Sequence, residues 1–89
     1  MNSSNLTDRK YYSLYIGNLS GNVRPKELIQ YLEQFDEVDQ CQFFEANQRR
    51  WSTFAFVLMR TPDSINRLMS TRPHYLDNRR FVDKRSFEF

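Results

Sequence analysis

The chain has 89 residues, enough for one small domain. Its hydrophobic fraction of 39% is too high for a disordered tail, and its charged fraction of 27% is too high for a membrane span. The single cysteine, Cys41, cannot form an internal disulfide, which fits a nuclear or cytosolic compartment. With two glycines and no Gly-Lys-Ser/Thr string, the sequence lacks the common nucleotide-binding loops, so no cofactor is expected. Residues 1–45 carry four basic and seven acidic side chains, net −3, whereas residues 46–89 carry nine and four, net +5 and rich in arginine, which favours a nucleic-acid partner.

The first half of the chain predicts a strand and then a helix. Residues 1–10 have no periodic pattern, and we expect a flexible N-terminal arm there. The aromatic and β-branched segment that follows predicts a strand over residues 11–17. Pro25, followed by apolar residues at spacings of four and three, predicts an amphipathic helix over residues 25–34.

Two further strands are expected in the middle of the chain. Residues 38–44 form the second strand candidate, and a polar loop separates it from residues 51–59. The latter segment, WSTFAFVLM, is the strongest strand pattern in the sequence because β-branched and aromatic residues dominate it.

The last part of the chain predicts a short helix and a final strand. Thr61 is placed to cap a helix that begins at Pro62 and ends near Ser70. Asp77-Asn78 is typical of a turn, and the residues after it predict a strand over residues 80–84.

The order strand, helix, strand, strand, helix, strand indicates the α+β, ferredoxin-like βαββαβ sandwich, with two helices packed on one face of a four-stranded antiparallel sheet. Alternation along the strands places Tyr15, Phe44, Phe54 and Phe56 on one face. The helices pack more readily over the smaller aliphatic side chains of the other face. The aromatic face is therefore expected to be bare and to bind the flat bases of single-stranded nucleic acid.

The residues of two strands carry a family resemblance. Residues 14–19, LYIGNL, fit the strand-one hexamer of an RNA-recognition motif domain, and residues 52–59 fall on its strand-three octamer. The resemblance covers residues 11–86 and leaves 87–89 as a C-terminal tail. Arg72-Pro73-His74 and the segment after it are similar to the heterogeneous nuclear ribonucleoprotein A/B class. The implied function is binding of single-stranded RNA in mRNA processing or regulation, in the nucleus or the cytoplasm.

The resemblance implies roles for individual residues. Tyr15, Phe54 and Phe56 correspond to the positions that stack on bases or sugars in this family. The same comparison places four further side chains on the RNA face: Gln42, Phe44, Val82 and Lys84.

Two positions depart from the family pattern in the octamer. Ser52 and Thr53 stand where the family has Lys or Arg followed by Gly, so a phosphate contact expected from the first position is missing. Arg49 and Arg50, just upstream, are candidates to replace that contact, and we keep Ser52 among the site residues.

Three other interpretations compete with this one. The tail residues Phe87 and Phe89 could fold back over the rings. Alternatively, the domain could bind a peptide, a protein partner or another RNA-recognition motif through its helical face, for which Arg79-Arg80-Phe81 is a weak match because Phe81 is expected to point inward. An enzyme has no supporting set of nucleophile, base and orienting group. We interpret Cys41 as a buried thiol and His74 as a turn residue, and we expect an isolated monomer.

Overall fold

The computed structural model describes residues 13–47 and 52–86. Expectations for the arm at 1–10, for Arg49 and Arg50, and for the tail at 87–89 lie outside these ranges. In chain order the elements are β1 (Ser13–Leu19), α2 (Pro25–Leu32), β2 (Val38–Phe44), β3 (Thr53–Met59), α3 (Pro62–Ser70), β4 (His74–Leu76) and β5 (Arg79–Arg85).

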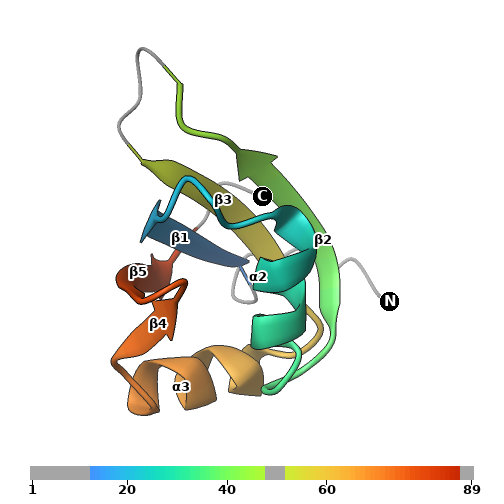
Figure 1. Cartoon of the computed structure of the whole chain (residues 1–89). Coiled ribbons are helices and arrows are strands. Elements are labelled where there is room, and N and C mark those ends of the chain that lie inside the picture. The colour runs from blue at the N-terminus through green and yellow to red at the C-terminus, as the bar shows by residue number, and fades with distance from the viewer. Residues whose placement is uncertain (1–12, 48–51, 87–89) are drawn as a thin grey trace.

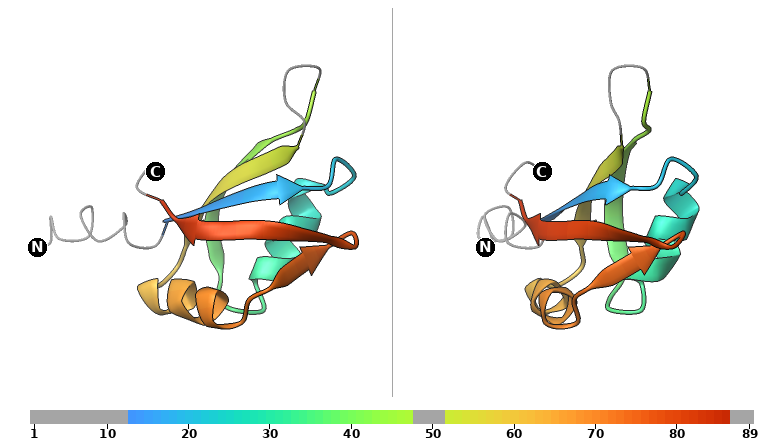
Figure 2. Two further views of the ribbon diagram at one scale, coloured as in Figure 1. Left: turned by 90° about the vertical axis from the view of Figure 1, so that its left-hand side faces the viewer. Right: turned by 60° about the vertical axis from the view of Figure 1, so that its left-hand side comes forward.

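The strands form one antiparallel sheet in the order β2-β3-β1-β5-β4. Both helices lie on the same side of this sheet, as Figure 1 and the turned views in Figure 2 show. The predicted ferredoxin-like arrangement is therefore confirmed, and no helix of residues 13–47 and 52–86 lies on the opposite face of the sheet. Neither helix in the described ranges is long and apolar enough to cross a membrane.

The helix α2 is two residues shorter than predicted. Its last regular bond joins the Glu33 amide to the Ile29 carbonyl. The next two amides, of Gln34 and Phe35, instead donate to carbonyls three residues back, which is the tighter bonding of a terminal 3₁₀ turn. By contrast, the predicted bounds of β2 and α3 are confirmed.

The expected sheet of four strands is wrong by one strand. Residues His74–Leu76 pair with Phe81–Arg79 and form a fifth strand, β4. Asp77 and Asn78 connect them, and both have a positive φ, 54° and 60°. Positive φ at both central residues matches the right-handed twist of a two-residue hairpin, so the predicted turn also creates a strand before it.

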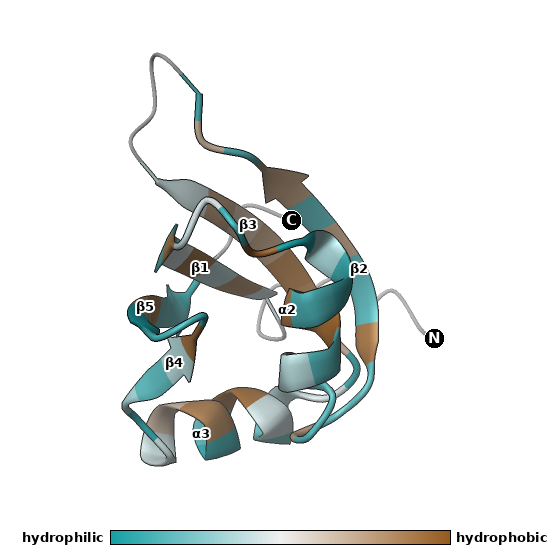
Figure 3. Ribbon diagram, in the orientation of Figure 1, coloured by the Kyte–Doolittle hydropathy of each residue, from teal (hydrophilic) through white to brown (hydrophobic). Residues whose placement is uncertain are grey.

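The hydrophobic core lies between the sheet and the helices. It contains the inward side chains of β1, β3 and β5 and the apolar stripes of both helices, namely Leu14, Ile16, Leu19, Val23, Leu28, Leu32, Ala55, Val57, Met59, Ile65, Leu68 and Phe81. Figure 3 shows the most continuous hydrophobic colouring along β3.

His74 belongs to this core and is not a turn residue. Its ring stacks on Phe81 with centroids 5.5 Å apart. Its Nε2 lies 2.7 Å from the Leu68 carbonyl, which can only accept, so Nδ1 accepts the hydrogen bond from the Tyr31 hydroxyl at 2.6 Å. Burial, with a further contribution from the charge of Asp83, raises the pKa of Tyr31 and keeps that donor protonated. The buried imidazole therefore has both nitrogens satisfied and joins β4 to both helices.

Candidate nucleic-acid interface

Four aromatic rings meet on the face of the sheet that the helices leave open. Phe44 and Phe54 stack nearly parallel, with centroids 4.9 Å apart and an interplanar angle of 17°. Phe56 stands almost perpendicular to Phe54, at 6.0 Å and 89°, and lies 5.6 Å from Tyr15. Cross-strand pairing explains the cluster, because Phe44 faces Phe54 and Tyr15 faces Phe56 in the ladders. The four residues, which we call the ring platform, are each partly exposed.

Gly17 and Lys84 set the position of the Tyr15 ring. A Cβ at Gly17 would lie 2.5 to 2.8 Å from the hydroxyl oxygen and two ring carbons of Tyr15, so the ring lies flat over a position that only glycine leaves open. Lys84 is the cross-strand partner of Tyr15, and its Nζ lies 5.4 Å from the ring centroid. A cation is thereby held beside the platform by a π face.

The other predicted site residues surround the platform. Gln42 is exposed and pairs with Phe56, and Val82, which pairs with Gly17, is 48% exposed. Ser52 directly precedes β3 and is half-buried. Toward the other end of the same face, Ser13 and Leu58 are buried. The structure therefore brings together all the predicted side chains of the described ranges.

Unpaired cations are concentrated on β5. Nine basic residues lie in the described ranges, and four of them, none on β5, are in ion pairs: Arg24, Arg60, Arg67 and Arg72. Of the five that have no acidic partner within those ranges, four lie on β5: Arg79, Arg80, Lys84 and Arg85. Two of these four, Arg80 and Lys84, have the strand parity of the platform face, so they place positive charge beside the platform.

Two exposed side chains on the β4–β5 hairpin were not predicted as site residues. Tyr75, which is 54% exposed, is the cross-strand partner of Arg80. Arg80 has the same strand parity as Val82 and Lys84, so this pair lies on the ring-platform side of the sheet. The sequence could have revealed them only by treating Asp77-Asn78 as the loop of a hairpin.

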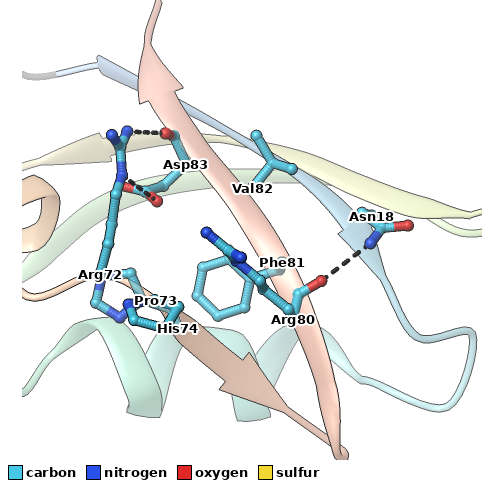
Figure 4. A pocket seen from close by; sticks show the side chains of 8 residues that line it. All are labelled: Asn18, Arg72, Pro73, His74, Arg80, Phe81, Val82 and Asp83. Atoms are coloured by element: carbon cyan, nitrogen blue, oxygen red, sulfur yellow. Dashed lines mark hydrogen bonds and ion pairs between the residues drawn. The ribbon is translucent and has the colours of Figure 1, made fainter.

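A cavity of about 340 Å³ lies at the outer edge of β5 (Figure 4). The Arg72 guanidinium closes one side of it by donating to the Asp83 carboxylate, at 2.9 Å from Nε, and to the Asp83 carbonyl. The Arg80 side chain and the Phe81 ring are both among the groups that line the cavity (Figure 4). Because Arg72 is paired with Asp83, Arg80 is the cation lining this cavity that has no acidic partner in the described ranges.

A sequence profile for the RNA recognition motif matches residues 14–82. The chain belongs to this family. Among curated relatives, this RNA recognition motif chain is 32% identical over 74 residues to the heterogeneous nuclear ribonucleoprotein D-like protein of Xenopus tropicalis, covering 82% of the chain. It is 28% identical over 75 residues, 83% of the chain, to RNA-binding protein Musashi homolog 1 of Caenorhabditis elegans. These matches span about a quarter of either relative, 25% and 23%.

Solved structures share the fold of this RNA recognition motif chain at low sequence identity. The RNA-binding domain of Hrp1, solved in complex with RNA, matches with a TM-score of 0.75 and 22% identity over 86% of this chain and 46% of that one. The third RNA recognition motif of Mip6 matches with a TM-score of 0.74 and 12% identity, covering 85% and 93% of the two chains. The resemblance to the heterogeneous nuclear ribonucleoprotein class inferred from the sequence agrees with the D-like relatives.

Proposed function

We propose that this domain binds single-stranded RNA by stacking bases on the ring platform. The observation that carries the proposal is the set of four partly exposed rings in mutual contact on the sheet face without a helix. Such rings accept any base, because every base has a π face, and stacking contributes about 1 to 3 kcal/mol per base. After the costs of ordering a flexible strand, two or three stacked bases correspond to an affinity on the order of micromolar.

Phosphate binding is assigned to β5 in this proposal. Lys84 lies directly beside Tyr15, so a phosphate that follows a base stacked on that ring comes within reach of the ammonium group. Gln42 and Val82 line the two sides of the platform and are assigned hydrogen bonding and apolar contact with the bases. Arg49 and Arg50 remain candidate phosphate contacts on sequence grounds alone, and Ser52 remains a candidate contact at the start of β3.

Peptide binding through the helical face is not favoured. The Phe of Arg79-Arg80-Phe81 is 2% exposed and packs in the core, so it is not available to a ligand as a loop residue. The names of the curated relatives support a role in ribonucleoprotein complexes of the nucleus, with mRNA processing as the proposed process and no catalytic step.

The double substitution Phe54→Ala, Phe56→Ala tests the proposal. Loss of two rings should weaken RNA binding by about 2 to 6 kcal/mol, at least roughly 30-fold, measured by fluorescence anisotropy with degenerate tetranucleotide RNA pools. The matched control is Phe54→Tyr, Phe56→Tyr, which keeps both π faces and should bind like the parent.

Amide chemical shifts complete the test. RNA added to the parent domain should move the amide signals of β1, β2 and β3 and leave those of α2 and α3 in place. Unchanged affinity of the double alanine variant, or shifts confined to the helices, would exclude stacking on the platform.

A further inference from the structure

The exposed apolar side chains of this domain share one face of the sheet from edge to edge. The large hydrophobic residues that are exposed in the described ranges are Phe44 on β2, Val82 on β5 and Tyr75 on β4, with 36%, 48% and 54% of their surface accessible. Phe44 stacks within the ring platform, while Val82 and the Tyr75–Arg80 pair have the parity of that same face. The apolar surface therefore continues past β5 onto the hairpin.

Charge changes along this surface. On β2, Asp39 pairs with Arg60 and leaves no excess of positive charge, whereas β5 carries four cations without acidic partners. In the described part of the chain the Arg80 guanidinium makes no hydrogen bond or ion pair, and only its backbone carbonyl is engaged, by Asn18 at 2.9 Å. A polyanion with flat, apolar bases is complementary to both properties at once.

The hairpin is held in place before any ligand arrives. The Asn18 side chain donates to the Arg80 carbonyl and accepts from the Arg79 guanidinium, each at 2.9 Å. The Ser20 hydroxyl donates to the Asp77 carboxylate at 2.6 Å, which ties the turn to the loop after β1. Because these bonds fix the hairpin against the sheet, binding there requires little additional ordering of the protein.

We propose that the RNA track continues beyond β5 onto the β4–β5 hairpin, where Arg80 binds a phosphate and Tyr75 stacks one further base. This inference rests on the proposed function of the ring platform and extends it by a subsite. Neighbouring strands are about 4.8 Å apart, so β4 lies roughly 10 Å from β1. An RNA of four nucleotides that is stacked on the ring platform should not reach β4, whereas a longer RNA should. The cavity that Arg80 helps to line leaves room for the ribose and phosphate beside the Arg80 side chain.

The test compares degenerate RNA pools of four and eight nucleotides on Tyr75→Ala and Arg80→Gln. Both variants should bind tetranucleotides like the parent, because the platform is intact. Octanucleotide binding should weaken about 5- to 10-fold in Tyr75→Ala, the effect of one stacked base at the low end of the usual range. Arg80→Gln should reduce the logarithmic salt slope for octanucleotides by about 0.7, the value for one phosphate contact on a single strand.

Conservative and distant variants serve as controls. Tyr75→Phe keeps the ring and should bind octanucleotides like the parent. Lys26→Gln removes one positive charge from the exposed surface of α2 and should leave octanucleotide affinity unchanged. Because Tyr75 and the Arg80 side chain are exposed, all four variants should keep the thermal midpoint of the parent.

The outcomes separate the two proposals. If Phe54→Ala, Phe56→Ala abolishes tetranucleotide binding while Tyr75→Ala and Arg80→Gln bind octanucleotides like the parent, the ring platform stands and the extended track is wrong. If the hairpin variants change only self-association in sedimentation velocity, the hairpin surface contacts a second copy and the inference is overturned. If the double alanine variant keeps tetranucleotide affinity, the proposed function itself fails.

Discussion

A single hydrogen atom in place of a side chain determines the geometry of the Tyr15 ring. Gly17 has no positive φ, so the backbone at this position does not require glycine. The requirement comes from the ring itself, whose atoms occupy the space of a Cβ. A lowered ring lies flat on the sheet, beside Lys84 and in contact with Phe56, and presents its face to a ligand.

Gly17→Ala is therefore expected to weaken RNA binding without unfolding the domain. The new methyl group must displace the ring, since contacts below 3.0 Å to the Tyr15 hydroxyl oxygen and two ring carbons cannot persist. Loss of one stacking surface corresponds to about 1 kcal/mol or more of binding free energy, measured by anisotropy. The Tyr15 ring proton shifts and the Lys84 side-chain signals should change together in the NMR spectrum, because the cation–π contact is broken.

The control for this prediction is Gly21→Ala. Gly21 lies in the loop after β1, and a Cβ there meets nothing within 4 Å. The Gly21→Ala substitution should leave both RNA affinity and the Tyr15 NMR signals unchanged. Equal affinity of Gly17→Ala and the parent would mean that the ring orientation does not contribute to binding.

At the scale of elements, the position of the β4–β5 hairpin depends on a few polar bonds. The Ser20 hydroxyl is nearly buried, donates to Asp77 and accepts from the Asn22 amide at 3.1 Å. It joins the loop after β1 to the turn between β4 and β5. The sheet bonds of β4 with β5 cover only three residue pairs, so this link adds to the attachment that the His74 ring and the Asn18 bonds provide.

Ser20→Ala should loosen the hairpin selectively. Losing a hydrogen-bonded hydroxyl costs about 0.5 to 1.5 kcal/mol, and the free energy of unfolding should fall by that amount in a urea titration. Amide hydrogen exchange should accelerate in Leu76 and Arg79, the pair that flanks the turn, and remain slow in β1 and β3, because their ladders are intact.

Ser64→Ala is the matched control. It also removes a buried hydroxyl donor, to the Thr61 carbonyl, but within α3. It should destabilise the domain to a similar extent and leave exchange in the hairpin slow. Slow exchange of the Leu76 and Arg79 amides in Ser20→Ala would show that β4 is held by its strand pairing and the His74 ring alone.

The elements that the sequence predicts well are those with a clear period. The alternation of β3 placed Phe54 and Phe56 on one face and Ala55 and Val57 on the other, and the structure agrees. Pro62 fixed the start of α3, although the Thr61 hydroxyl donates to the Asp36 carboxylate and does not cap the helix. This bond lowers the pKa of Asp36 and joins the segment after α2 to the start of α3.

The features that the sequence does not predict come from tertiary contacts. β4 has three residues, too few for a period, and it is defined by pairing with β5. His74 follows Pro73, and this context is typical of a turn, yet its two ring nitrogens form hydrogen bonds with Tyr31 and the Leu68 carbonyl. Likewise, the flat orientation of the Tyr15 ring depends on the space that Gly17 leaves open. The excess of positive charge on β5 arises because the acidic partners in the described ion pairs bind arginines outside β5.

For the whole molecule, the distribution of paired charge matters more than net charge. The formal net charge is only +2. Arg60 lies within 3.2 Å of Glu37 and 3.6 Å of Asp39, so its field is largely cancelled near the sheet edge, whereas Lys84 faces the platform without an acidic partner in the described ranges. A polyanion approaching the domain is therefore attracted to β5.

Substitutions that change the net charge equally should then have unequal effects on RNA binding. Lys84→Gln and Arg60→Gln each remove one positive charge, but only the first removes a cation from beside the platform. With two to three phosphate contacts, the parent should show a slope of log K against log salt of about −1.4 to −2. Lys84→Gln should reduce its magnitude by about 0.7, and Arg60→Gln should leave it unchanged, in anisotropy titrations over a series of salt concentrations. Equal reductions in both variants would mean that RNA responds to the total charge of the domain, and the assignment of phosphate binding to β5 would then be wrong.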